Sequence, residues 1–387
     1  MILLKNGLVY TMRTDKPEIM DVLLEGKLIK KIGKNIKAPK SANVIDCTDQ
    51  LVMPGFVDAH CHLGLWEDSL GFEGDDGNEM TDPITPHLRG IDAMNPMDVT
   101  FKEAREGGVT TAVAGPGSAN IIGGQFAAIK TYGDRIDDMI IKAPLAMKCA
   151  FGENPKRVYS GAKKAPNTRL AIVGEFRKTL FATKEYLAKK EAAGDDLSKM
   201  PAYDMKLEAM IPVIKKEIHL KAHAHRADDI FSAIRIAKEF DLLLSLEHCT
   251  EGHLIAEHLA KEGYPAIVGP TFGHRSKVEL KNKSFDTPAI LHKAGVKIAI
   301  MTDSPVIPLQ HLPMCAALAA KAGLDEMEAL RAISINAAEI TGIADRVGSL
   351  EVGKDADVVV WSKHPFELQA DVLMTIINGE VVYETIK

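Results

Sequence analysis

The chain has 387 residues, of which 46% are hydrophobic and 26% are charged, a composition typical of a globular protein with a sizeable core. This length excludes a small disulfide-stapled module and suits one large α/β barrel with an appendage. A formal charge of -6, from 47 basic and 53 acidic residues, does not favour nucleic acid or an anionic membrane as a partner.

The five cysteines show no CxxC spacing, which predicts reduced thiols rather than a disulfide framework. The first residues contain no basic segment followed by a long apolar stretch, and no run approaches the roughly 18 apolar residues of a membrane span. We therefore expect a soluble, cytoplasmic protein that acts on a small molecule, with no nucleic-acid or membrane partner. The sequence is also compatible with a homo-oligomer.

Both ends of the chain are rich in predicted β-strands. Short apolar runs within residues 1–52 are separated by Gly, Asp and Pro turns, and similar runs recur within residues 347–387. Asn378-Gly379 separates two of these later runs and is a typical hairpin turn. We expect residues 1–52 and 347–387 to form one small composite β-sandwich domain.

The middle of the chain, residues 53–346, alternates short apolar runs with amphipathic stretches. Seven runs resemble buried strands, and an eighth, weaker candidate lies near residues 125–131. In residues 226–241, apolar side chains recur at the spacing of one helical face. Near-continuous apolar strands between helices indicate parallel strands buried on both faces. We therefore predict a (β/α)8 barrel of the TIM type for this segment.

Polar residues come last in several of these runs, which is the end at which such barrels carry functional groups. His60 and His62 are two residues apart on a predicted strand, so both imidazoles point to the same side. His223, His248 and Asp303 end later strands. Imidazole nitrogens together with a carboxylate suit a divalent ion such as zinc. The sequence therefore predicts a divalent-metal site, with zinc as the favoured ion, at this end of the barrel.

The same segments resemble a known family. In chain order, MPGFVDAHCH, HAH, EHC, TDSP and VGSLEVGKDADVVVW are similar to motifs of the amidohydrolase superfamily, and most of all to its imidazolonepropionase-like branch, which includes dipeptidase-like enzymes. The resemblance implies a (β/α)8 barrel, a composite β-sandwich and one or two divalent metals that activate a water. It implies metal-ligand roles for His60, His62, His223 and His248, and it makes Asp303 both a ligand and the general base.

The sequence of the fourth barrel strand does not determine which residue bridges two metals. Two-metal members of the superfamily use a carboxylated Lys or a Glu for this purpose, and the candidates here are Lys148 and Glu153. We favour Glu153, because it lies at the carboxyl end of the strand and needs no prior modification. A single-metal site is the alternative.

Three further residues are candidates for substrate binding. His225 follows His223 by two residues and points the same way. His274 follows the seventh strand on the catalytic face, and Arg157 offers a planar fork for a carboxylate, although an exposed surface charge is an equally good interpretation. The acidic loop of residues 63–83 is expected to form a solvated lid over the site.

We expect a metal-dependent hydrolase that cleaves an amide, cyclic amide or peptide-like C–N bond, with Asp303 accepting a proton from water and passing it to the leaving nitrogen. A deaminase on the same scaffold and a catalytically silent barrel are the alternatives. Ring deaminases of the superfamily place a Glu shortly after the fifth-strand ligand, whereas no Glu follows His223 here until Glu239. This difference favours attack on an acyl carbon.

Overall fold

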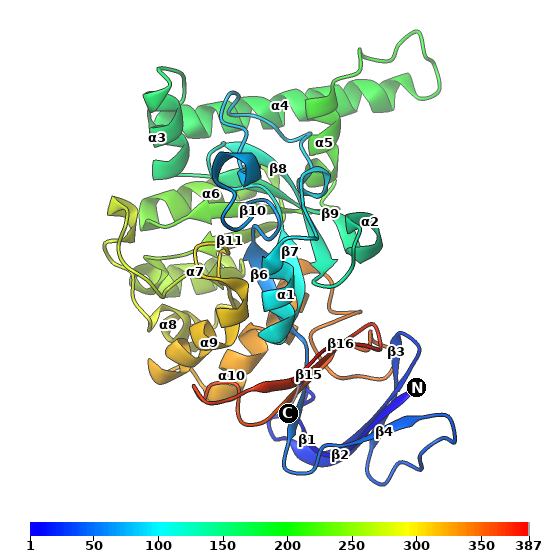
Figure 1. Ribbon diagram of the computed structural model, residues 1–387. Helices are drawn as coiled ribbons and strands as arrows, with labels where there is room; N and C mark the ends of the chain where they lie inside the picture. The colour runs from blue at the N-terminus through cyan, green and yellow to red at the C-terminus, as the bar shows by residue number, and fades with distance from the viewer. Residues whose placement is uncertain (386–387) are drawn as a thin grey trace.

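The computed structural model describes residues 1–385 and contains two eight-stranded sheets (Figure 1). One sheet is built from both ends of the chain. Its strands are β1 (Ile2–Val9), β2 (Glu18–Glu25), β3 (Leu28–Gly33), β4 (Asn43–Asp46), β5 (Leu51–Pro54), β14 (Val358–Trp361), β15 (Val372–Ile377) and β16 (Glu380–Glu384). The other sheet forms the barrel, with β6 (Phe56–Cys61), β7 (Val109–Ala114), β8 (Ile122–Lys130), β9 (Ile140–Ala150), β10 (His219–Ala224), β11 (Leu244–His248), β12 (Ala266–Val268) and β13 (Ile298–Ile300).

The terminal sheet has the strand order β16-β15-β14-β5-β1-β2-β3, with β4 beside β1. Strand β5 joins the two ends of the chain, because it pairs parallel with β1 and antiparallel with β14. It also extends the sheet to Pro54, slightly beyond the boundary expected from the sequence. The hairpin turn predicted at Asn378-Gly379 links β15 to β16, and both residues have the positive φ that a two-residue turn of this kind requires (51° and 78°).

The barrel sheet runs in chain order from β6 to β13. Its strands are parallel, as predicted, except for β8, which is antiparallel to both β7 and β9. Strand β8 is the weaker candidate near residues 125–131. Its direction follows from its connection to β7, because the short loop 115–121 carries no helix, whereas a parallel crossover needs about a dozen residues or more.

A buried carboxylate links the first and last barrel strands. Asp58 on β6 accepts hydrogen bonds through Oδ2 from the backbone N–H of Thr302 at 3.0 Å and from its hydroxyl at 2.6 Å. Through Oδ1 it accepts the backbone N–H of His60 at 2.9 Å. Burial raises the pKa of Asp58 to about 7, although these hydrogen bonds act in the opposite direction. The carboxyl group thus ties the start and the end of the barrel together beside the predicted metal ligands.

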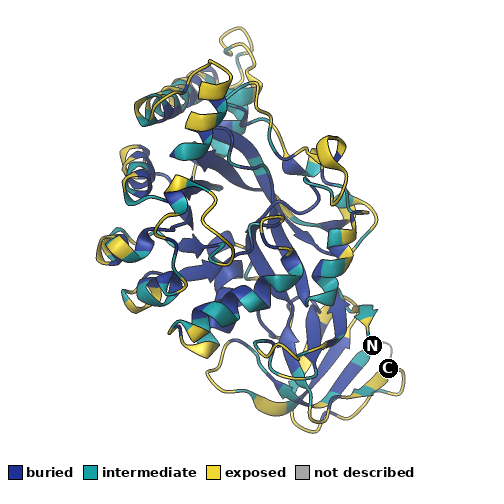
Figure 2. Ribbon diagram, turned by 60° about the vertical axis from the view of Figure 1, so that its left-hand side comes forward, coloured by how far each residue is buried: buried dark blue, intermediate teal, exposed yellow. Residues whose placement is uncertain are grey.

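Helices cover the barrel strands, which are almost entirely buried (Figure 2). The helices are α1 (Val99–Glu106), α2 (Ile136–Met139), α3 (Glu153–Gly161), α4 (Arg169–Ala193), α5 (Met205–Ile214), α6 (Ala227–Phe240), α7 (Ala256–Glu262), α8 (Thr287–Lys293), α9 (Leu312–Lys321), α10 (Glu326–Ala332) and α11 (Ile335–Thr341). Helices α4 and α5 lie on the far side of the barrel from the terminal sheet (Figure 1). Among residues 1–385, no helix is both long and apolar enough to span a membrane.

Candidate active site

The predicted ligands gather at the carboxyl ends of the barrel strands. They form two sets, which are His60, His62 and Asp303 on one side, and His223, His225 and His248 on the other. Within each set, one candidate ligand atom of each residue lies within 4.8 Å of the others. The structure therefore brings together the five residues expected from the strand ends, and it adds His225 to the second set.

In the first set, each imidazole is oriented by an acceptor on the side away from the cavity. The Nδ1–H of His60 donates to Oε2 of Glu247 at 2.7 Å, and that of His62 donates to the carbonyl oxygen of Gly115 at 2.7 Å. Both Nε2 lone pairs therefore face Asp303, whose Oδ1 lies 3.7 Å from His60 and 3.1 Å from His62. Burial lowers the pKa of His60 well below its ordinary value. A neutral ring oriented in this way is ready to bind a cation.

In the second set, the Nδ1–H of His248 donates to the carbonyl oxygen of Gly269 at 2.8 Å. Its Nε2 lone pair then lies 2.7 Å from Nδ1 of His223. His225 approaches the hydroxyl oxygen of Thr250 through Nδ1 at 2.7 Å. Burial is the main cause that lowers the pKa values of all three histidines well below the ordinary value. These rings are therefore neutral, as metal ligands must be.

A buried carboxylate, Glu279, tests whether the second set suits a metal. Its Oε1 lies 3.7 Å from Nε2 of His223 and 3.6 Å from Nε2 of His225, and it has no hydrogen-bond partner among residues 1–385. Nδ1–H of His223 donates to Nε2 of His248, and Nε2 of His223 accepts from Nδ2 of Asn154 at 3.3 Å. An orphaned carboxylate oxygen buried beside two neutral imidazoles is a group that a bound cation would satisfy, so the donor set fits a metal.

The backbone is strained where two of the ligands leave their strands. His248, Cys249 and Asp303 have φ values of 74°, 48° and 55°, in the left-handed region that non-glycine residues rarely adopt. Such a conformation costs about 1–3 kcal/mol per residue and is common at functional sites. Here it accompanies the sharp turns at the ends of β11 and β13 that place His248 and Asp303 in the site.

Lys148, rather than Glu153, lies next to the first set. The Lys148 side chain is fully buried, and its Nζ donates to Nε2 of His60 at 2.9 Å. Burial lowers the pKa of Lys148 to about 8, which increases the neutral fraction of the amine. The expected bridging residue, Glu153, is directed elsewhere, since its carboxylate accepts the backbone N–H of Glu279 at 3.2 Å. The structure therefore does not bring Glu153 to either set.

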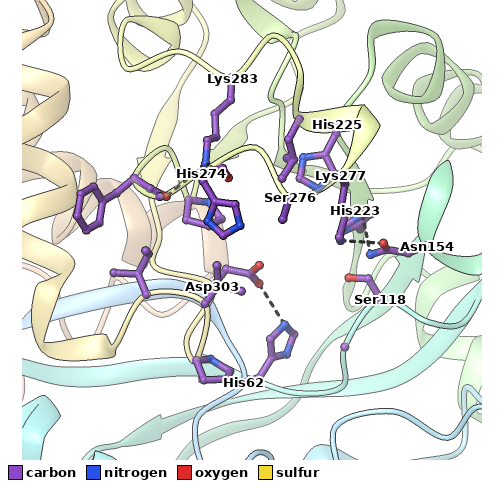
Figure 3. A pocket seen from close by; sticks show the side chains of 18 of the residues that line it. His62, Ser118, Asn154, His223, His225, His274, Ser276, Lys277, Lys283 and Asp303 are labelled. Carbon is purple, nitrogen blue, oxygen red and sulfur yellow. Dashed lines mark hydrogen bonds and ion pairs between the residues drawn. The ribbon is translucent and has the colours of Figure 1, made fainter.

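A cavity of about 360 Å³ opens over the two sets (Figure 3). His225 and His274 line it, as the sequence suggested. Arg157 does not line this cavity, because it lies on an exposed face of α3, and the expectation that it grips a substrate carboxylate is not supported. The more apolar part of the wall is formed by Trp66, Phe272, Leu280, Pro305, Val306 and Ile307.

The residues that support the predicted ligands were not anticipated from the sequence. Glu247 accepts a hydrogen bond from Nζ of Lys221 at 3.1 Å in addition to that from His60, and Asp58 links β6 to Thr302. Glu247 could have been found, because it is the only acidic residue in the apolar run LLLSLEHC, and a buried carboxylate needs partners. Glu279 gave no such signal, since it lies among charged residues outside the strands.

Comparisons with known proteins identify several relatives of this chain. Residues 51–382 match the model of the amidohydrolase family. The amidohydrolase tasK of Hapsidospora irregularis is 29% identical over 94% of this chain. The chain spans only 40% of the length of that relative. The imidazolonepropionase of Mesorhizobium japonicum is 26% identical, over 86% of this chain and 82% of that protein. The solved structure of an amidohydrolase from Thermotoga maritima MSB8 is 44% identical, with a TM-score of 0.97 over 100% of both chains.

Proposed function

Because the chain belongs to the amidohydrolase family of C–N bond hydrolases, we propose that it is a metal-dependent hydrolase of an amide, cyclic amide or peptide-like bond. One observation carries the proposal. His60 and His62 converge with Asp303, and His223, His225 and His248 converge in a second group, while burial lowers the pKa values of His60, His223 and His248 well below the ordinary value. Buried histidines with this arrangement suit divalent metal chemistry better than any role in packing.

We assign the metal ligands from the two sets. His60, His62 and Asp303 would hold one divalent ion, and His223 and His248 a second, with zinc as the ion that this donor chemistry favours. When bound, such ions polarise the substrate carbonyl and lower the pKa of a water toward neutrality.

Lys148 is our candidate for the bridge between the two ions. As an ammonium it would repel a cation at Nε2 of His60, which lies 2.9 Å away. Carbon dioxide can add to the neutral amine, forming an N–C bond and releasing a proton. The resulting carbamate is anionic and offers two oxygen ligands, which removes the repulsion.

Asp303 would move the proton. Its Oδ1 is within reach of both first-set imidazoles, so its carboxylate can accept a proton from the attacking water and then donate it to the departing nitrogen. The alternative, a ring deaminase, would need a proton-shuttling carboxylate shortly after β10, but the carboxylate nearest to His225 among the described residues is Glu279, which comes from the segment 270–283 and lies 3.6 Å from Nε2 of His225. Asp229 is paired with Arg169 through two hydrogen bonds of 2.7 and 2.9 Å, and Asp228 is paired with Arg226.

We place the enzyme in the cytoplasm, acting on a small molecule. All five cysteines are free and buried, as is usual for a protein kept under reducing conditions. A homo-oligomer is a further expectation that sedimentation or light scattering can check.

The test is a hydrolysis screen on protein that has been stripped of metal with a chelator and then reloaded with zinc. Activity on an N-acyl amino acid, dipeptide, lactam or hydantoin-like ring should disappear on stripping and return with the metal. Asp303→Asn should lower kcat by about 10²- to 10⁴-fold while the circular dichroism spectrum stays unchanged. Ammonia release from a nucleobase-like ring would instead support a deaminase. Absence of both bound metal and metal-dependent activity would support a silent barrel.

A further inference from the structure

We propose that Lys277 recognises a carboxylate of the substrate, so that the enzyme acts on amides that carry an anionic group close to the scissile bond, such as N-acyl derivatives of apolar amino acids. The inference rests on the proposed amide hydrolysis and names its substrate class. Lys277 lies in the segment 270–283, which follows β12 and forms one wall of the cavity, and its side chain lies near His223 (Figure 3).

The ammonium group of Lys277 is held at the cavity but is not fully used. Its Nζ donates to Oδ1 of Asn154 at 2.8 Å, and Nδ2 of Asn154 lies 3.3 Å from Nε2 of His223. A lysine ammonium has three donors. The nearest carboxylate oxygen, Oε1 of Glu279, is 3.8 Å away, which is beyond hydrogen-bond distance. Within residues 1–385, two donors of Lys277 are therefore left for a ligand.

The other charged residues that line the cavity are already engaged. Lys283 is buried, and its Nζ donates to the carbonyl oxygens of His274 at 3.0 Å and Phe272 at 3.4 Å. These hydrogen bonds stabilise the conformation of the segment, so the ammonium group is not directed at a ligand. Asp303 is the one acidic residue of the lining, and it faces His62. Among the side chains that line the cavity, Lys277 is therefore the cation available to an anion, and Glu279, whose Oε1 lies 3.8 Å from its Nζ, offsets part of its charge.

The segment that carries Lys277 supplies two further polar side chains to the cavity. The hydroxyl of Ser276 and the imidazole of His274 line the same cavity. Neither side chain makes a hydrogen bond to another part of the described chain, residues 1–385. A carboxylate accepts several hydrogen bonds at once, so an ammonium, a hydroxyl and an imidazole on one segment suit it well.

The position of Lys277 limits how far the anionic group lies from the reacting amide. Nζ of Lys277 and Nε2 of His223 both lie within 3.8 Å of the same Glu279 oxygen, so they are at most two such distances apart. This short span matches a carboxylate a few bonds away from the scissile amide. The apolar lining, which includes Trp66, Leu280 and Ile307, suits an apolar side chain on the same substrate.

The experiment compares matched substrates that differ only in charge. N-acetyl-leucine, N-acetyl-methionine and N-acetyl-phenylalanine are each paired with the corresponding neutral carboxamide, and kcat/KM is measured for both. Wild-type enzyme should prefer the carboxylate by about 10- to 100-fold, as a hydrogen-bonded charge predicts, with the difference mainly in KM. Lys277→Met should bring this ratio close to one, and Lys277→Arg should retain most of it. Lys281→Met is the matched control, because Lys281 is exposed on the same segment and does not line the cavity.

Several results would overturn the inference without touching the proposed function. These are hydrolysis of both members of a pair with a ratio near one in wild type, an unchanged ratio in Lys277→Met, or an equal loss in Lys281→Met. If no amide is hydrolysed, calorimetric binding of N-acetyl-leucine and its carboxamide decides separately. Preferential binding of the carboxylate that is lost in Lys277→Met would uphold the anion site and reject the hydrolase. If Lys277→Met fails to fold, the salt dependence of wild type serves instead, since only the carboxylate KM should rise with ionic strength.

Discussion

We expect the number of bound metals to depend on Lys148. It is fully buried beside Nε2 of His60, whereas Glu153 is paired with the backbone of Glu279. We therefore expect Lys148→Met to lower bound metal from about two equivalents to about one, because the bridging ligand is lost, and Glu153→Gln to leave the count unchanged. Elemental analysis of stripped and reloaded protein gives the answer. The opposite pattern would return the bridge to Glu153, and no loss in either variant would indicate a single-metal site.

Asp303 shows why the choice of substitution matters at this scale. Its φ of 55° lies in the left-handed region, which Asn tolerates better than most residues. Asp303→Asn therefore removes the proton acceptor while it retains the backbone conformation, so that a loss of turnover reports on chemistry rather than on strain.

At the scale of the element, strand β11 carries one proposed metal ligand and the residue that orients another. His248 ends the strand, and the preceding Glu247 accepts hydrogen bonds from His60 and Lys221. Glu247→Gln should weaken metal binding by about 10- to 100-fold, because the carboxylate no longer orients His60. It should also destabilise the fold by about 3–5 kcal/mol, because the buried ammonium of Lys221 loses its charged partner.

The two effects of Glu247→Gln can be separated by a second substitution. In the double variant Lys221→Met/Glu247→Gln the unpaired ammonium is gone, so the free energy of unfolding in urea should recover in part. Metal affinity, measured by competition with a chelator, should not recover. Joint recovery of stability and affinity would show that Glu247 acts only through the ion pair and not through His60.

At the scale of the whole molecule, the terminal sheet and the barrel are joined by buried contacts. Lys130 at the end of β8 pairs with Asp355, at 2.8 Å, and with Asp357, which both precede β14. The rings of Phe56 on β6 and Trp361 on β14 lie 5.7 Å apart. Because contacts of this kind span the two sheets, we expect both parts to unfold in one transition.

Lys130→Met tests this junction. It leaves the buried carboxylate of Asp357 without its cation, while Asp355 keeps Arg346 at 2.8 Å, and it should lower the stability of the whole chain by about 3–5 kcal/mol. The exposed pair of Lys102 with Glu106 predicts a change below about 1 kcal/mol for Lys102→Met. A Trp66→Phe background allows Trp361 fluorescence to report on the terminal sheet and circular dichroism at 222 nm on the barrel helices. Separate midpoints for the two signals would show that the parts unfold independently.

Periodicity and strand order made much of this protein predictable from its sequence. The continuous apolar runs indicated the barrel, because a strand that is covered on both faces has apolar side chains on both sides and does not alternate apolar with polar residues. A period of two within a strand placed His60 beside His62, and the rule that the carboxyl ends of parallel strands meet brought in His223, His248 and Asp303. For these residues, the position in a strand was sufficient to predict the position in the folded protein.

Tertiary structure decided the features for which no such rule exists. The antiparallel direction of β8 followed from a connection without a helix, and Lys148 reached the site from mid-strand while Glu153, at the strand end, did not. Glu153 instead contacts Glu279, which lies 126 residues further along the chain. Lys277 lines the cavity because it belongs to the same segment as Glu279. Contacts between loops form after the strands are assembled, and they depend on the way in which the flexible side chains and turns satisfy their charges and hydrogen bonds. Neither the hydrophobic period nor the strand order encodes that outcome.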